Sequence, residues 1–288
     1  MSKIRIDNQD HKALFSIPAA SHSTAIATVK PLPPQRKITG HKQTDAYLWV
    51  LDVIKTNESA HLAAAEEALE KLTITPKQAQ ERYSQHLIKS GLAPFQIAFG
   101  TMNLDNPHGY IKGAKRAIEE ASKVRATFCT YEAAMENTEA ENLMLAGKVG
   151  ELYSGQYFWN EKEKAEGCMY GDRIAETEKL RKDLVKGFAE LLPEPETLSD
   201  VVREYQYWHW LYEMRSAAYQ ELYDDYYHGS DTWIYDREDY LEEKLATIQP
   251  VNRKEAVSVC EWLLDNGRFD GRSDITNRVI LNLVGECN

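Results

Sequence analysis

The 288-residue sequence lacks the glycine motifs on which common nucleotide-binding and hydrolytic sites depend. It has no GxxxxGKS/T, no GxGxxG after a strand and no GxSxG, so no segment is suited to cradle phosphate groups or to present a nucleophile on a sharp turn. These absences argue against an NTPase, a dinucleotide-dependent oxidoreductase and an α/β-hydrolase. We therefore expect no cofactor.

Cysteine is scarce, and long apolar runs are missing. The four cysteines lie far apart without a CxxC pair, which favours reduced structural thiols over disulfides or a metal site. No apolar run approaches the roughly 18 residues that a membrane span needs. The first thirty residues also lack the apolar core of a secretory signal. We therefore expect a cytoplasmic protein with no membrane segment.

The sequence has no stretch of period-two alternation bounded by turns, which argues against a substantial sheet. Apolar residues recur instead at helical spacing. We predict an all-α fold, a multi-helix bundle of about eight to ten helices with an extended N-terminal arm. The expected helices cover residues 44–54, 58–72, 76–90, 110–136, 138–153, 161–192, 200–227, 236–247, 253–265 and 274–285, with a short apolar piece over 93–102. The expected N-caps are Thr44, Thr75, Thr138 and Ser199.

Prolines divide the chain. Four of them lie between residues 16 and 40, where they remove amide donors and favour extended backbone. Pro193 and Pro195 form a second break. We predict an extended basic arm over 1–43, an N-terminal helical bundle over 44–192 and an aromatic-rich helical subdomain over 197–288.

Positive charge is concentrated at the start of the chain. Residues 1–43 hold seven Lys or Arg and two Asp, a net charge of +5, which leaves −16 for the rest of a chain whose net charge is −11. Such an arm is suited to nucleic acid, and also to the acidic body of the same chain or of a neighbouring subunit. The residues expected to contact nucleic acid are Lys30, Arg36, Lys37 and Lys42.

Aromatic residues are unusually dense between Tyr205 and Tyr240. On a helix they form two stripes, of which one, headed by Tyr205 and Trp208, suffices for a core. The other stripe is suited to protein contact, because Tyr and Trp dominate interface anchors. Burial of both stripes in the core and base stacking are the alternatives, although acidic neighbours repel phosphates. The residues predicted to bind a protein partner or a second copy are Tyr207, Trp210, Met214, Tyr227 and Trp233.

Metal-ligating residue types gather once in the sequence. The cluster comprises Glu221, Asp224, Asp225, His228 and Asp231, whose oxygen atoms and imidazole are suited to a hard cation or to acid–base chemistry. A simpler interpretation is that His228 places a cation at a helix C-terminus that Gly229 caps.

Arg203 and His209 are separated by five residues on the same expected helix. This spacing resembles the Arg-x(4–6)-His motif of HEPN-type ribonucleases, although Glu204 follows the arginine instead of the family's usual Asn, Asp or His. The resemblance implies a metal-independent attack of the RNA 2′-hydroxyl assisted by these two side chains.

The C-terminal third contains the segments ATIQPVNRKEAVSVCEWLL and ITNRVILNLVGE after the aromatic helix. Their layout resembles uncharacterised helical accessory proteins of bacteriophages and prophages. The aromatic surplus and the absence of catalytic motifs make a non-enzymatic interaction protein, which binds a protein partner or itself, the leading hypothesis. A ribonuclease and a nucleic-acid-binding arm are the alternatives.

Overall fold

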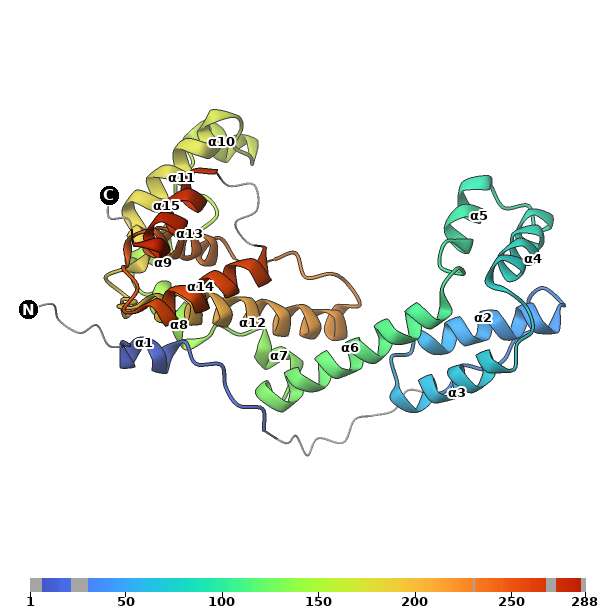
Figure 1. Cartoon of the computed structure of the whole chain (residues 1–288). Helices are drawn as coiled ribbons and strands as arrows, with labels where there is room; N and C mark the ends of the chain where they lie inside the picture. The colour runs from blue at the N-terminus through green and yellow to red at the C-terminus, as the bar shows by residue number, and fades with distance from the viewer. Residues whose placement is uncertain (1–6, 22–30, 230, 268–272, 286–288) are drawn as a thin grey trace, which may run out of the picture. The chain divides into compact units, whose positions relative to one another are not determined.

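The computed structural model describes residues 7–21, 31–229, 231–267 and 273–285, and Figure 1 shows their course. Over these residues all regular structure is helical, with fifteen α-helices, ten of them seven residues or longer, and no strand. The predicted all-α multi-helix class is confirmed. None of the described helices is both long enough and apolar enough to cross a lipid bilayer.

The chain forms two compact units. The large unit comprises Met1–Ala19 together with Glu132–Asn288, and the small unit comprises Ala20–Tyr131. These ranges differ from the expected 1–43, 44–192 and 197–288, since the start of the arm belongs to the large unit and the break at Pro193 and Pro195 lies inside it.

The small unit is built around one buried helix. Its helices are α2 (Lys42–Ile54), α3 (Ser59–Glu70), α4 (Pro76–Lys89), α5 (Pro94–Thr101) and α6 (Pro107–Phe128). Helix α2 packs against α3, α4 and α6, and its side chains Tyr47, Val50 and Val53 are almost fully buried. The indole nitrogen of Trp49 donates to the carbonyl of Pro33 at 2.7 Å, which attaches the proline-rich segment to this helix.

The caps of the small unit agree in part with the sequence. Thr75 is confirmed as the N-cap of α4, and it also forms a capping box with Gln78. Thr44 was wrongly expected to be a cap, because α2 begins at Lys42 and Thr44 lies buried in its first turn. Helix α6 ends earlier than expected, where Cys129 takes a positive φ of 66°.

The large unit combines one short N-terminal helix with the later part of the chain. Its helices are α1 (Gln9–Leu14), α8 (Glu139–Met144), α9 (Lys148–Glu151), α10 (Glu161–Glu166), α11 (Asp172–Val185), the 3-10 turn η1 (Lys186–Phe188), α12 (Leu198–Tyr223), α13 (Thr232–Thr247), α14 (Arg253–Asn266) and α15 (Ser273–Val284). A further short helix, α7 (Tyr131–Ala134), begins at the last residue of the small unit.

Glycines break the helix that was expected over 161–192. Gly167 ends α10 in the left-handed conformation. Gly187 has a φ of +60°, and a Cβ added there would lie 2.2 Å from the ring of Tyr240. Only glycine suits this position, because it combines a positive φ with close packing of a side chain.

The N-terminal arm is not extended throughout. Helix α1 lies in it, capped by the Asn8 side chain, which accepts from the amides of Asp10 and His11. Phe15 follows it, fully buried against the rings of Tyr207 and Trp208, with ring centroids 5.5 and 5.7 Å away. Residues 16–21 and 31–40 form no helix, as predicted for the rest of the arm.

A fully buried carboxylate joins α1, α12 and α13. Glu204 on α12 accepts from Nε2 of His11 at 2.8 Å and from the Arg237 guanidinium at 2.7 and 2.9 Å. The Trp208 indole adds a third donor at 3.2 Å, and Arg237 also donates to the carbonyl of Gly187 at 2.6 Å. Burial alone raises the pKa of Glu204, but the charge of Arg237 and the hydrogen bond from His11 outweigh it, so this pKa is lowered.

Removal of one partner from this cluster should destabilise the large unit. In Arg237→Met, Glu204 keeps its charge in the core with fewer donors, and we expect a loss of about 3–5 kcal/mol in the free energy of unfolding. Denaturant unfolding followed by circular dichroism measures it. The control Glu67→Ala removes an exposed ion pair with Lys71 and should leave the curve unchanged. Equal curves for wild type and Arg237→Met would contradict a charged cluster.

The lowered pKa of Glu204 also predicts acid sensitivity. A carboxylate whose folded pKa lies below its unfolded pKa stabilises the fold above the unfolded pKa, about 4.3 for Glu. This contribution is lost as pH falls from there through the folded pKa. Denaturant midpoints at pH 7 and pH 3 should therefore differ more in wild type than in Glu204→Leu/Arg237→Met. If the midpoint changes equally between pH 7 and pH 3 in both proteins, Glu204 is not the source of the acid sensitivity.

Candidate functional site

The aromatic helix of the large unit is α12, and both of its ends differ from expectation. Thr197 rather than Ser199 caps it, in a capping box with Asp200. Its last helical residue is Tyr223, after which Asp224 takes the left-handed conformation with φ 52° and ψ 38°. The chain therefore turns four residues before the expected end, and His228 does not lie at a helix C-terminus.

The predicted partner-binding residues are not on one surface. Tyr207 and Met214 are buried in the large unit, which corrects the expectation that they face a partner. Trp210 is half-buried, with its ring 5.7 Å from that of Tyr207. Trp233, also half-buried, meets the ring of Tyr153 edge-on at 5.9 Å. The stripe that was expected to be spare is therefore largely core.

The other aromatic stripe is buried at Tyr205 and Trp208 and reaches the surface further along the helix. Tyr212, Tyr219 and Tyr223 share one side of α12, because steps of seven and four residues nearly complete whole turns. The turn at Asp224 returns the chain, and Tyr227 packs 5.7 and 5.8 Å from the rings of Tyr212 and Tyr219. Tyr219 and Tyr223 are 4.6 Å apart. We call the surface formed by Tyr212, Tyr219, Tyr223, Tyr226 and Tyr227 the tyrosine face.

Two members of the tyrosine face are strongly exposed. Tyr226 is 81% exposed and Tyr223 is 62% exposed. Tyr227 lies deeper, and burial raises the pKa of its hydroxyl. The face therefore offers the accessible ring of Tyr223, which packs on Tyr219, and next to Tyr227 in the chain the exposed ring of Tyr226.

Negative charge surrounds the tyrosine face. Glu213, Glu221, Asp224 and Asp225 are exposed. Arg215 is the one Lys or Arg between residues 209 and 231. Its guanidinium is buried and bound by both oxygens of Glu141, at 2.7 and 2.8 Å, so it does not offset the surface carboxylates. The face is acidic.

The residues of the expected metal cluster do not form a coordination sphere. Among the residues that the structure describes, no three His, Cys, Asp or Glu side chains are placed to share a metal ion. Asp224 accepts from the Gln220 side chain at 3.1 Å, and Asp225 accepts from the amide of Tyr226 at 2.8 Å. Burial raises the pKa of Asp231. The carboxylates spread along the turn because α12 ends before His228.

Arg203 and His209 point to different sides of α12. Six residues turn the helix through about 600°, so the two lie about 120° apart around its axis. The Arg203 guanidinium donates to Asp200 at 2.6 Å and to Asp7 at 3.1 Å. His209 is exposed, 3.5 Å from Glu213. The structure does not bring the two side chains together within one chain.

The basic residues of the arm lie in or near the small unit. Arg36, Lys37 and Lys42 are exposed, the first two before α2 and the third as its first residue. Lys30 lies outside the described residues. Nucleic-acid binding through these side chains stays a prediction.

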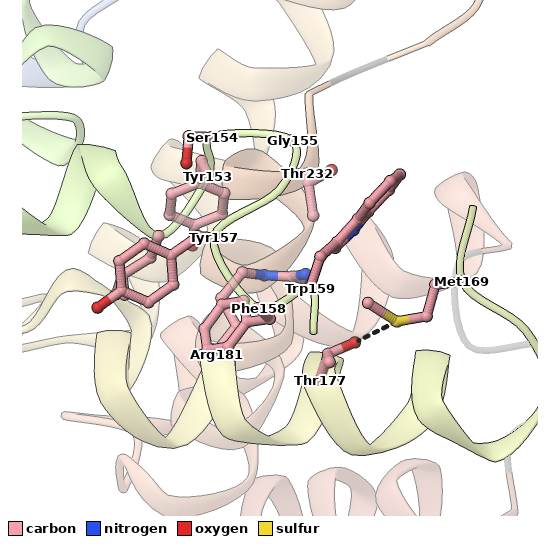
Figure 2. A pocket seen from close by; sticks show the side chains of 11 residues that line it. Tyr153, Ser154, Gly155, Tyr157, Phe158, Trp159, Met169, Thr177, Arg181 and Thr232 are labelled. Carbon is pink, nitrogen blue, oxygen red and sulfur yellow. Dashed lines mark hydrogen bonds between the residues drawn. The ribbon is translucent and has the colours of Figure 1, made fainter. Parts of the chain in front are cut away.

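A small pocket of about 190 Å³ lies in the large unit, and Figure 2 shows its side chains. It is lined by Leu152, Tyr153, Ser154, Gly155, Tyr157, Phe158, Trp159, Met169, Thr177, Arg181 and Thr232. The Arg181 guanidinium donates to both oxygens of buried Asp236, at 2.7 and 3.1 Å. The Tyr153 hydroxyl donates to the same carboxylate at 2.8 Å.

The pocket offers mainly aromatic side chains for contact with a bound group. The charge of Arg181 is balanced by Asp236, and burial raises the pKa of Tyr153, which keeps its hydroxyl protonated. The single hydroxyl proton of Thr177 has three acceptors within reach, namely the carbonyls of Arg173 and Ile174 in its own helix and the sulfur of Met169, which Figure 2 shows. The lining is thus suited to a small neutral group and supplies no paired acid and base. No sequence motif indicates this site, because its lining combines the irregular segment 152–159 with side chains of α11 and the first residue of α13.

No protein-family model, curated protein or solved structure matches this chain.

The positions of Tyr207 and Tyr226 predict that the same substitution changes the free energy of unfolding strongly at one and little at the other. Tyr207→Ala removes a buried ring that packs on Phe15 and Trp208, and should lower the free energy of unfolding by about 3–5 kcal/mol. Tyr226→Ala should change it by less than about 0.5 kcal/mol, because that ring is exposed. Chemical denaturation of both variants measures this. Similar small effects for both would contradict the packing of α1 on α12.

Proposed function

We propose that the protein is a non-enzymatic interaction protein whose tyrosine face binds a segment of a partner protein rich in Arg and Lys. The observation that carries this proposal is the exposure of Tyr223, which packs on Tyr219, and of Tyr226, among exposed carboxylates. Tyrosine provides a large contact area at a small cost in side-chain entropy, and its ring face attracts cations. Surrounding carboxylates add attraction for the same partner and repel anionic ones.

The charge of the face sets the kind of partner. A symmetric contact with a second copy would place Glu213, Asp224 and Asp225 against the same groups, and like charges at an interface are costly. Nucleic acid meets the same repulsion through its phosphates. A cationic protein segment suits both the rings and the carboxylates.

The alternatives have weaker support. A ribonuclease needs an arginine available to the scissile phosphate, whereas Arg203 is held by two carboxylates. The phage or prophage setting stays a proposal that rests on the layout of the C-terminal third.

Binding of a labelled Arg-rich dodecapeptide, followed by fluorescence anisotropy, tests the proposal. Tyr223→Ser/Tyr226→Ser should weaken binding about five- to thirty-fold, because each ring contributes about 0.5–1 kcal/mol to a cation at an exposed site. Asp224→Asn/Asp225→Asn should weaken it and reduce its salt dependence, and Asn keeps the left-handed conformation at 224 accessible.

The matched control is Tyr170→Ser, which removes an equally exposed tyrosine of the large unit, 68% exposed, outside the tyrosine face. Its affinity should equal that of wild type. A Glu-rich peptide should not bind. Unchanged affinity in the Tyr223/Tyr226 variant, or equal binding of both peptides, would refute the proposal.

A further inference from the structure

The pocket in Figure 2 lies between the irregular segment 152–159 and helix α11. Two side chains of α11 bind this segment near its two ends. The Arg173 guanidinium donates to the carbonyl of Phe158 at 3.3 Å. The Arg181 guanidinium lies over the ring of Tyr153, 5.6 Å from its centroid, within the range of a cation–π contact. The segment is therefore held against the helix although it has no regular structure of its own.

Tyr153 forms a fixed wall of the pocket. Its ring stacks on that of Phe188, with centroids 5.9 Å apart and planes inclined by 19°, and meets Trp233 edge-on. Its hydroxyl donates to the carboxylate of Asp236 at 2.8 Å. A wall that is held by three contacts keeps its place without a ligand, so binding there does not have to order it.

Aromatic rings make up most of the lining. The lining includes the rings of Tyr153, Tyr157, Phe158 and Trp159, and the thioether of Met169. The rings of Tyr157 and Phe158 are inclined by 73°, with centroids 4.9 Å apart. Aromatic rings attract a further ring in edge-to-face or offset-stacked positions, and a thioether sulfur makes favourable contacts with ring edges. The lining is therefore complementary to an aromatic group.

The size of the pocket limits what it can hold. Its volume is about 190 Å³. An apolar cavity of about 150 Å³ takes up benzene, whereas sites for drug-sized ligands and cofactors measure about 300–1,000 Å³. One ring with a small substituent therefore fits, and a nucleotide or a flavin does not.

The charges around the pocket favour a neutral ligand. Among the described residues that line it, Arg181 is the charged one, and both oxygens of Asp236 accept from its guanidinium. A charged ligand would lose hydration there without gaining a counter-charge that is not already paired. A neutral ring loses little hydration and gains contact with the aromatic lining.

We infer that this pocket binds a single neutral aromatic ring, such as that of a phenol. A free phenol and a tyrosine side chain of a partner protein share this chemistry, and experiment separates the two sources. The site goes beyond the tyrosine face, because other residues form it and because it selects a neutral group instead of a cation.

The probe is p-fluorophenol, whose fluorine NMR signal shifts and broadens on binding. The full-length protein should bind it more tightly than it binds p-fluorobenzoate or p-fluorobenzylamine. Tyr157→Ala should weaken the binding of p-fluorophenol about two- to ten-fold through the loss of one aromatic contact. The matched control is Tyr235→Ala, because Tyr157 and Tyr235 are both 51% exposed and Tyr235 is not in the lining. This control should bind as wild type does.

A second variant fills the pocket instead of enlarging it. Thr232 is exposed, lines the pocket and is the first residue of α13, so Thr232→Trp places a ring where the ligand would lie. It should abolish the binding of p-fluorophenol and leave the far-ultraviolet circular dichroism spectrum unchanged.

Competition identifies the source of the ring. A blocked pentapeptide with one central Tyr among Gly residues displaces p-fluorophenol as well as p-cresol does if the natural ligand is a protein side chain. Displacement by p-cresol alone indicates a free small molecule. Either result supports the site.

Three outcomes would overturn the inference. They are absence of p-fluorophenol binding at low millimolar concentration, wild-type affinity in both Tyr157→Ala and Thr232→Trp, and tighter binding of either charged probe. The last would assign the pocket to a charged ligand. None of these outcomes bears on the tyrosine face, which is tested with a cationic peptide and different residues.

Discussion

The buried carboxylate of Glu204 constrains the large unit more than any other single group. A charge without water requires donors around it, and here they come from α1, α12 and α13, through His11, Trp208 and Arg237. If these helices separate, the Glu204 carboxylate either becomes exposed or loses its hydrogen-bond donors. The residues before α2 are therefore not simply a detached basic tail, because the part that contains His11 completes the core.

The same docking decides which aromatic side chains are accessible. Phe15, which follows α1, packs against Tyr207 and Trp208, so rings of both stripes are core in the first half of α12. Helix α12 extends to Tyr223, and the turn at Asp224 folds Tyr227 back onto Tyr212 and Tyr219. The many aromatic residues of α12 are thus divided into two groups. One group is buried with the help of the N-terminal segment, and the other lies at the surface, where the turn at Asp224 adds Tyr227.

Local signals in the sequence were sufficient for the helical class and for several helix starts. The cap at Thr75 and the capping box of Thr138 with Glu141 act within one turn, so both could be predicted. Contacts between residues far apart in the sequence could not be predicted. His11 contacts Glu204, 193 residues away, and the break at Gly187 depends on Tyr240 and Arg237. Helical periodicity alone therefore predicted one helix over 161–192, which the fold divides. The aromatic helix could be found from composition. Which of its aromatic side chains are exposed could not, because that depends on the segments that pack against the helix.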